Sequence, residues 1–131
     1  MAKIVYKEGV EPLSGIYCGI EYKTYKSGAN SAVLQRLPTE KEAKKNPAAR
    51  AELIVKLCVA NIQRQMSDPH EAIKQYTNIM HRVQRLYGRL YELEKNNDKL
   101  QQMILDAYYG KRRVLPSRRV DEPRLALDVP P

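Results

Sequence analysis

Histidine is the side chain best suited to acid–base catalysis near neutral pH, and this sequence contains two, His70 and His81. His70 lies between Asp68 and Glu71, and a helix start with a capping box explains both carboxylates. His81 falls at the outermost position of a heptad repeat, where a side chain faces solvent. We therefore expect no catalytic residues and a chain that is not an enzyme, unless a partner subunit completes a site.

The two cysteines, Cys18 and Cys58, lie far apart, and neither has a second cysteine at CxxC spacing. Neither combines with a histidine pair at the spacing of zinc ligands, so the sequence predicts no metal site and no cofactor. Burial is the usual environment of such a cysteine. The N-terminus lacks the apolar core of a signal peptide, and no apolar run approaches the roughly 18 residues that cross a membrane. We expect a protein that is neither secreted by a signal peptide nor inserted in a membrane.

A basic segment near the C-terminus is the strongest candidate for nucleic-acid binding. Its cationic residues are Lys111, Arg112, Arg113, Arg118 and Arg119. They follow Tyr108-Tyr109, so guanidinium groups for phosphates and rings for stacking on bases stand together. Arginine pairs also bind carboxylates, which leaves an acidic protein partner as the alternative. Prolines in residues 110–131 favour an extended arm that docks on a neighbour, and a solvated basic tail is the alternative.

The charge of the chain is unevenly distributed. Its 131 residues include 23 basic and 15 acidic side chains, a net charge of +8, and the excess lies toward the two ends. Such a balance favours contact with nucleic acid or another acidic surface. Phe and Trp are absent while nine residues are Tyr, which predicts one domain with a modest core of Leu, Ile, Val and Tyr.

Apolar residues recur with a seven-residue (heptad) period through residues 68–109, which predicts one long helix with a coiled-coil stripe. The stripe is the predicted interface with other protein subunits and consists of Ile79, Val83, Leu86, Leu90, Leu93, Asn97, Leu100 and Ile104. Asn97 takes an a position, where a buried amide fixes register against its own copy. The alternative is that Asn96-Asn97-Asp98 breaks the helix into two antiparallel pieces.

A shorter helix is predicted over residues 48–66. Asn46-Pro47 supplies its N-cap and first helical residue, and the apolar residues that follow cover most of its circumference. The short connection to the long helix predicts an antiparallel helical hairpin. Because the long helix extends beyond its partner, we expect its second half to pack against another chain.

Strand and turn signals lie in the N-terminal part. Residues 16–26 are rich in Ile and Tyr, residues 27–30 form a Gly-containing turn, and residues 31–37 return as a second strand that Pro38 ends. This pattern predicts a β-hairpin. A shorter strand is predicted over residues 3–6.

Three further sequence signals in the N-terminal part predict local features of the backbone. Thr39 and Glu42 have the spacing of a capping box, which predicts a helical turn that begins there. Gly15 and Gly19 indicate a bulge or a close approach of the backbone to another segment. Phosphate binding is the alternative for these glycines, but a GKS/T element and a following helix start are lacking.

These elements together predict an α+β protein that is mainly α. It has an N-terminal β-hairpin, an antiparallel helical hairpin with one long helix, and an extended C-terminal tail. We divide the chain into the β-hairpin with its connecting turn (residues 1–45), the helical hairpin or coiled-coil region (residues 46–109) and an extended basic, Pro-containing arm (residues 110–131).

Residues 22–38 (YKTYKSGANSAVLQRLP), followed by residues 45–50 (KNPAAR), resemble a pattern of small proteins of tailed bacteriophages and related mobile elements. In that pattern a Gly-containing hairpin leads through an Arg-x-Pro step into a helix started by Asn-Pro. The resemblance implies a virion component, such as a capsid, neck or connector part, in the virion or the host cytoplasm. It transfers no site residues.

We therefore expect a non-enzymatic structural protein that oligomerises or docks into a larger complex of protein subunits. This expectation rests on the heptad period of apolar residues and on the predicted docking arm. A nucleic-acid-binding accessory protein that uses the basic ends of the chain is the alternative.

Overall fold

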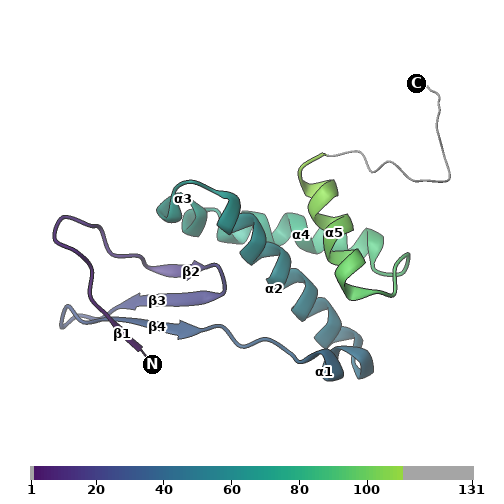
Figure 1. The fold of residues 1–131 in the computed structure, drawn as a ribbon, viewed down its shortest axis with the longest axis horizontal. Helices are drawn as coiled ribbons and strands as arrows, with labels where there is room; N and C mark the ends of the chain where they lie inside the picture. Colours follow the sequence, from purple (N-terminus) through teal and green to yellow (C-terminus); the bar gives the residue numbers. More distant parts are fainter. Residues whose placement is uncertain (1, 111–131) are drawn as a thin grey trace.

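In residues 2–110, the part of the chain that the computed structural model describes, four short strands are followed by five helices (Figure 1). The strands are β1 (Ala2–Ile4), β2 (Gly15–Tyr17), β3 (Ile20–Thr24) and β4 (Asn30–Leu34). The helices are α1 (Glu40–Lys45), α2 (Pro47–Gln65), α3 (Pro69–Lys74), α4 (Tyr76–Leu90) and α5 (Asn97–Tyr108). The predicted α+β class, with a larger helical share, is confirmed.

The strands form one antiparallel sheet in the order β1-β4-β3-β2. β3 and β4 are the predicted hairpin, and a hydrogen bond of 2.9 Å from Tyr25 N to Ala29 O closes its turn. The single strand predicted over residues 16–26 is divided into β2 and β3 by a two-residue turn at Cys18-Gly19. Both turn residues have positive φ, 53° and 82°, as a type I′ turn requires.

Local capping explains where the first two helices begin. Thr39 Oγ1 accepts a hydrogen bond of 3.1 Å from Glu42 N, and Glu42 Oε1 accepts one of 3.0 Å from Thr39 N. This is the predicted capping box, which is confirmed. Asn46 Oδ1 accepts a bond of 2.9 Å from Ala48 N, so the predicted helix start at Asn46-Pro47 is confirmed as well.

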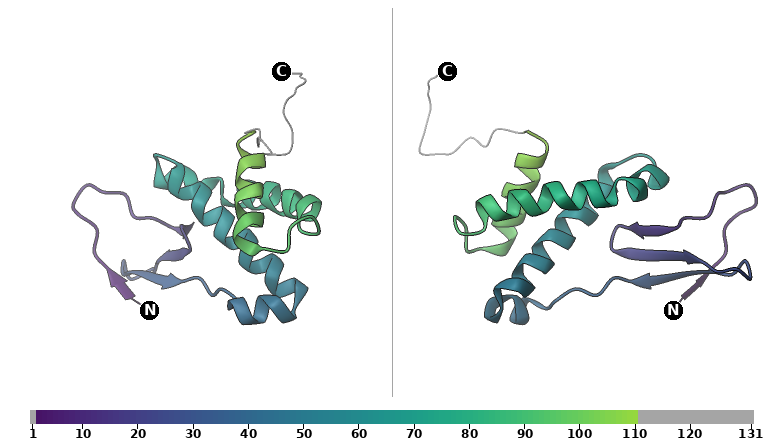
Figure 2. Two further views of the ribbon diagram at one scale, coloured as in Figure 1. Left: turned by 45° about the vertical axis from the view of Figure 1, so that its right-hand side comes forward. Right: turned by 180° about the vertical axis from the view of Figure 1, so that it is seen from behind.

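Helices alone form the hydrophobic core of the described chain. α4 packs across α2, and α5 packs against both of them (Figure 2). The buried core side chains come from these helices and are Ile54, Val55, Cys58, Val59, Ile62, Ile79, Val83, Tyr87, Leu100, Ile104 and Leu105. α1 packs against α2 at the end of this unit. No helix within residues 2–110 is both long and apolar enough to cross a membrane.

The prediction of one continuous helix over residues 68–109 is wrong. α4 ends at Leu90, and α5 begins at Asn97 after an intervening loop. Asn96 ends the helical repeat because its Oδ1 caps α5, accepting a hydrogen bond of 3.0 Å from Lys99 N. α5 then crosses α4 at a steep angle and folds back onto its own subunit instead of projecting from it (Figures 1 and 2). The helix is broken, as the alternative predicted, but the loop covers residues 91–96 and the two pieces cross steeply instead of lying antiparallel (Figures 1 and 2).

The helices meet the sheet at its β2 edge, where Gln63 of α2 is fully buried. Gln63 Oε1 accepts a hydrogen bond of 2.9 Å from Cys18 N, and its Nε2 donates one of 2.7 Å to Ile16 O. The same Nε2 donates to Ala72 O of α3 at 3.1 Å. One side chain therefore bonds a carbonyl of β2 and an amide of the turn that follows it, and joins this edge of the sheet to two helices.

Gly15 is the point of closest approach between β2 and α3. Its φ is +127°, a region that L side chains rarely adopt, and a Cβ added there would overlap Cγ2 of Ile73. The close backbone approach predicted at this glycine is confirmed. Gly19 serves a different purpose, since it lies in the turn between β2 and β3.

Candidate functional site

The sheet is the least covered part of the described chain. The helices reach it mainly at β2, and β1, β3 and β4 extend away from them (Figures 1 and 2). Among the described strand residues no apolar side chain is buried, and the one buried residue is Ser31. The sheet therefore keeps apolar side chains in contact with solvent on faces that no helix covers.

One face of this sheet carries no charged strand residue. Residues that oppose each other across antiparallel strands point to the same face. On this face, which we call the uncharged face, they are Ile4, Tyr17, Ile20, Tyr22, Thr24, Asn30, Ala32 and Leu34. Leu34 is 80% exposed, and burial raises the pKa of Tyr22 above its ordinary value of 10.0, so this phenol is neutral at physiological pH. The opposite face carries Lys3, Glu21 and Lys23.

The structure does not bring the predicted coiled-coil residues together in one stripe. Because α5 folds back, four of them are buried in the chain's own core: Ile79, Val83, Leu100 and Ile104. Leu86 and Leu90 pack partly buried against that core. Leu93 is 73% exposed in the loop before α5, and Asn97 faces Arg50 of the same subunit. The four core residues are thus unavailable to a partner chain.

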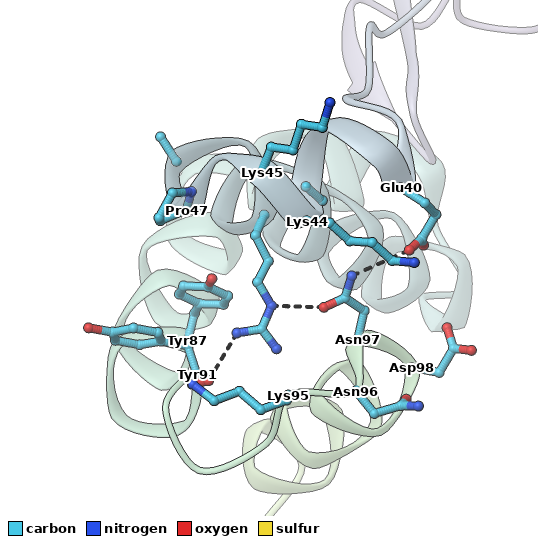
Figure 3. A pocket seen from close by; sticks show the side chains of 13 residues that line it. Glu40, Lys44, Lys45, Pro47, Tyr87, Tyr91, Lys95, Asn96, Asn97 and Asp98 are labelled. Atoms are coloured by element: carbon cyan, nitrogen blue, oxygen red, sulfur yellow. Dashed lines mark hydrogen bonds between the residues drawn. The ribbon is translucent and has the colours of Figure 1, made fainter.

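A cleft of about 900 Å³ lies where α1, the start of α2, the end of α4 and the loop before α5 meet (Figure 3). Its volume falls in the range of pockets that hold small molecules. The lining residues are Glu40, Ala43, Lys44, Lys45, Pro47, Ala48, Arg50, Tyr87, Tyr91, Lys95, Asn96, Asn97 and Asp98. We call this site the basic cleft, since its lining holds four cationic and two acidic side chains.

Arg50 spans the basic cleft from α2 to the loop before α5 (Figure 3). Its Nε donates a hydrogen bond of 2.8 Å to Asn97 Oδ1. Its Nη1 and Nη2 donate to the carbonyl oxygens of Tyr91 and Glu94 at 3.0 and 2.6 Å. Asn97 Nδ2 in turn donates to Glu40 Oε2 at 3.4 Å. Charge-assisted bonds of this kind fix the loop against α2.

Two tyrosines form one wall of the basic cleft. The rings of Tyr87 and Tyr91 are stacked, with centroids 5.3 Å apart and planes 8° from parallel. Burial raises the pKa of Tyr87, and the nearby Arg50 partly offsets that rise. Tyr87 is part of the core, whereas Tyr91 keeps 38% of its surface exposed. The pair therefore forms a flat aromatic surface, which we call the shelf: the Tyr87 ring is fixed in the core, and the Tyr91 ring is partly exposed to solvent.

Three lysines line the basic cleft without an acidic partner. Within residues 2–110, Lys44, Lys45 and Lys95 form no ion pair with a carboxylate. Glu40 and Asp98 are the two carboxylates of the lining, so the cations outnumber them. The cleft therefore favours an anionic ligand over a cationic one.

No protein-family model, curated protein or solved structure matches this chain. Of the residues that line the basic cleft, Asn97 alone is among the site residues predicted from the sequence, and it was predicted to lie at a subunit interface. One signal pointed to the cleft: Arg50 is a cation in a helix that is otherwise largely apolar. Its partners are two carbonyl oxygens and an amide, which no sequence pattern identifies.

His70 and Cys58 contact other parts of the subunit, whereas His81 lies on its surface. His70 Nε2 lies 3.0 Å from Glu11 O, and Asp68 Oδ1 caps the helix by accepting from His70 N at 3.0 Å. His81 is exposed on α4. Cys58 is buried in the core, and burial raises its pKa to about 12. In the described part of the chain no group of three His, Cys, Asp or Glu side chains is placed to hold a metal ion.

The basic C-terminal segment lies outside the described residues. The predicted binding residues that it contains are Lys111, Arg112, Arg113, Arg118 and Arg119. The tyrosines before it are described: Tyr108 and Tyr109 meet edge to face at 5.2 Å, and the guanidinium of Arg82 lies 4.2 Å from the centre of the Tyr108 ring. The cation of Arg82 therefore already covers the Tyr108 ring that was predicted to stack on bases.

Proposed function

We propose that this chain is a non-enzymatic assembly protein that associates with a second copy through the uncharged face of its sheet. One observation carries the proposal: the described strands contain no buried apolar side chain, while the buried core lies within the helices. A small sheet gains its stability from a covered hydrophobic face. A second protein surface supplies the cover that the subunit itself lacks.

The uncharged face is the surface of the sheet on which two copies meet with the least charge repulsion. The whole chain carries a net charge of +8, so most contacts between two copies bring like charges together. The uncharged face avoids that repulsion, because none of its strand residues is ionised at neutral pH. Tyr17 and Tyr22 add aromatic area together with hydroxyl groups, a combination that is enriched at protein interfaces.

The resemblance of residues 22–38 and 45–50 to small phage proteins supports a particular kind of assembly. These residues contain the β3–β4 hairpin and the Asn46-capped start of α2. On this basis the assembly is a virion, and the chain is one of its capsid, neck or connector parts. Purification of native particles, followed by mass spectrometry of their proteins, tests this assignment: the chain is expected at a fixed stoichiometry to the major structural protein.

Sedimentation velocity of the full chain at micromolar concentrations tests the association through the sheet. We expect the wild-type protein to sediment as a dimer and Leu34→Glu to sediment as a monomer. A carboxylate at this exposed position leaves the fold intact but is desolvated when two copies meet.

Leu93→Glu is the matched control, because Leu93 is a leucine of similar exposure, 73% against 80%, in the loop before α5. This variant is expected to remain a dimer. Dissociation of the Leu93 variant with an intact Leu34 dimer would instead locate the interface at that loop. A wild-type chain that is monomeric and folded at every concentration would exclude a second copy as the partner.

A further inference from the structure

The basic cleft combines two features that a subunit interface does not require. The first is the shelf of Tyr87 and Tyr91, whose stacked rings leave Tyr91 38% exposed. The second is the group of lysines without carboxylate partners in the described chain, Lys44, Lys45 and Lys95. Their side chains point in different directions: Lys95 lies beside Tyr91, Lys44 lies beside Glu40, and Lys45 points away from both (Figure 3).

We propose that the basic cleft binds a nucleotide, with the base stacked on the exposed ring of Tyr91 and the phosphate held by the neighbouring Lys95 (Figure 3). An aromatic ring accepts any base on its π-face, and lysine is a point-charge ligand for phosphate. The cleft volume of about 900 Å³ accommodates a ligand of this size. The nucleotide is either free or part of a single strand, since both present the same base and phosphate.

Arg50 prepares the site without binding the phosphate. Its Nε, Nη1 and Nη2 atoms each already donate a hydrogen bond within the subunit. The bond to Tyr91 O holds the backbone of the stacking residue, and the bond to Glu94 O, at 2.6 Å, holds the residue before Lys95. A site fixed in this way loses little conformational freedom when a ligand binds.

The carboxylates of the cleft restrict how the ligand lies. Glu40 Oε2 accepts a hydrogen bond of 3.4 Å from Asn97, and Asp98 lies in the first turn of α5. Both repel phosphate, so the phosphate is expected near Lys95 and Tyr91, away from Glu40 and Asp98 (Figure 3). Carboxylates accept hydrogen bonds from the amino groups and ribose hydroxyls that a nucleotide offers.

Photo-crosslinking of the full chain locates the bound base. The probe is a single-stranded thymidine oligonucleotide that carries one 5-iodouracil, and peptide mapping by mass spectrometry identifies the modified residue. We expect the adduct on Tyr91. Adducts found exclusively on other tyrosines or within residues 111–131 would overturn the proposal, because the base would then lie elsewhere.

Fluorescence anisotropy with a labelled thymidine oligonucleotide tests the phosphate contact. The variant Lys95→Gln removes the proposed contact, and Lys74→Gln is a control with the same loss of charge at an exposed site outside the cleft. For the cleft variant we expect weaker binding and a salt-dependence slope shallower by about 0.7, because each phosphate contact on a single strand contributes roughly that amount. Equal effects of the two variants would show that net charge alone governs binding, and would overturn the proposal.

Competition separates the two sources of the ligand. Displacement of the labelled strand by thymidine monophosphate supports a free nucleotide as sufficient ligand, whereas a Tyr91 adduct without such displacement supports a strand. Displacement by an acidic peptide, together with no Tyr91 adduct, would overturn the proposal in favour of a protein ligand. The monomeric Leu34→Glu variant is measured in parallel, so failure of this proposal is distinguishable from failure of the association through the sheet.

Discussion

Arg50 determines much of the local shape of the helical unit. Its guanidinium donates to carbonyl oxygens of Tyr91 and Glu94, in the loop that follows α4. Carbonyl groups at the end of a helix lack intrahelical partners and carry a partial negative charge, so a cation is stabilising there. The same group reaches Asn97 at the start of α5. One side chain therefore holds the end of one helix and the start of the next.

Cys58 makes the stability of the core dependent on pH in the alkaline range. Burial raises the pKa of its thiol from 9.0 to about 12. Between these values the unfolded chain releases the proton while the folded chain retains it, so the free energy of unfolding falls as pH rises from about 9 to about 12. Below about pH 9 both states hold the proton, and the contribution of this thiol is constant.

Between about pH 9 and pH 11, we expect the free energy of unfolding to fall by about 2–3 kcal/mol less in Cys58→Ala than in the wild type. Urea denaturation at each pH, followed by circular dichroism, measures this difference. The substitution also leaves a cavity, which lowers stability equally at every pH, so the slope is the informative quantity. Tyr17, Tyr22, Tyr87 and Tyr109 also have pKa values raised by burial, and they maintain part of the decline. Val59→Ala, at a buried neighbour in α2 without a titratable group, also leaves a cavity; it is the control and should keep the wild-type slope. Equal slopes in both variants would contradict this account.

At the scale of the elements, Gln63 joins the helices to the sheet. We expect Gln63→Leu to lower the free energy of unfolding by about 2–4 kcal/mol, because a side chain of similar size leaves the edge groups of Ile16 and Cys18 without their partner. Amide hydrogen exchange should show the loss at β2 first. Gln65→Leu, on the exposed surface of the same helix, is the control and should change stability little. Equal stability of the two variants would mean that water replaces Gln63 at no cost.

Local signals predicted the elements whose partners are close in sequence. The capping box at Thr39, the helix start at Asn46 and the β3–β4 hairpin all depend on neighbours within a few residues. The prediction of a continuous helix was wrong because the heptad period of apolar residues continues across the break. Leu93 fits this period although it lies in an exposed loop. One local feature, the Asn96 cap, and one long-range feature, the hydrogen bonds of Arg50 to the loop, outweigh that periodicity.

The basic cleft was beyond sequence reasoning for a physical reason. Its residues come from α1, α2, α4, the loop after α4 and the start of α5, and they meet because α5 folds back across α4. A prediction that placed α4 and α5 in one straight helix kept Asn97 beyond the start of α2 and so away from Arg50. The uncharged face, in contrast, follows from the alternation of residues in β3 and β4, once the turn at Cys18-Gly19 sets the pairing with β2.

At the scale of the molecule, the helices hold the buried core and the sheet is attached at one edge. We therefore expect a fragment of residues 39–110 to fold by itself. Far-ultraviolet circular dichroism should show its helical content, and heating should give a cooperative transition at a lower temperature than in the full chain, because the contacts of Gln63 to β2 are lost. A fragment of residues 2–38 is the counterpart and should remain unfolded. A fragment 39–110 without a cooperative transition would mean that the sheet contributes to the core.

The contact of Gln63 with β2 also bears on polymerisation. A strand edge with free amide and carbonyl groups is a template for another chain, and a fibre grows when every added unit offers a new edge. Within residues 2–110 one outer edge, β2, is occupied by Gln63, and β1 is left as the other. The association proposed through the uncharged face leaves β1 unpaired, whereas the hydrogen bonds of Gln63 at β2 hinder the addition of a further strand there. Gln63 thus protects one edge of an exposed sheet from the strand addition by which fibres grow.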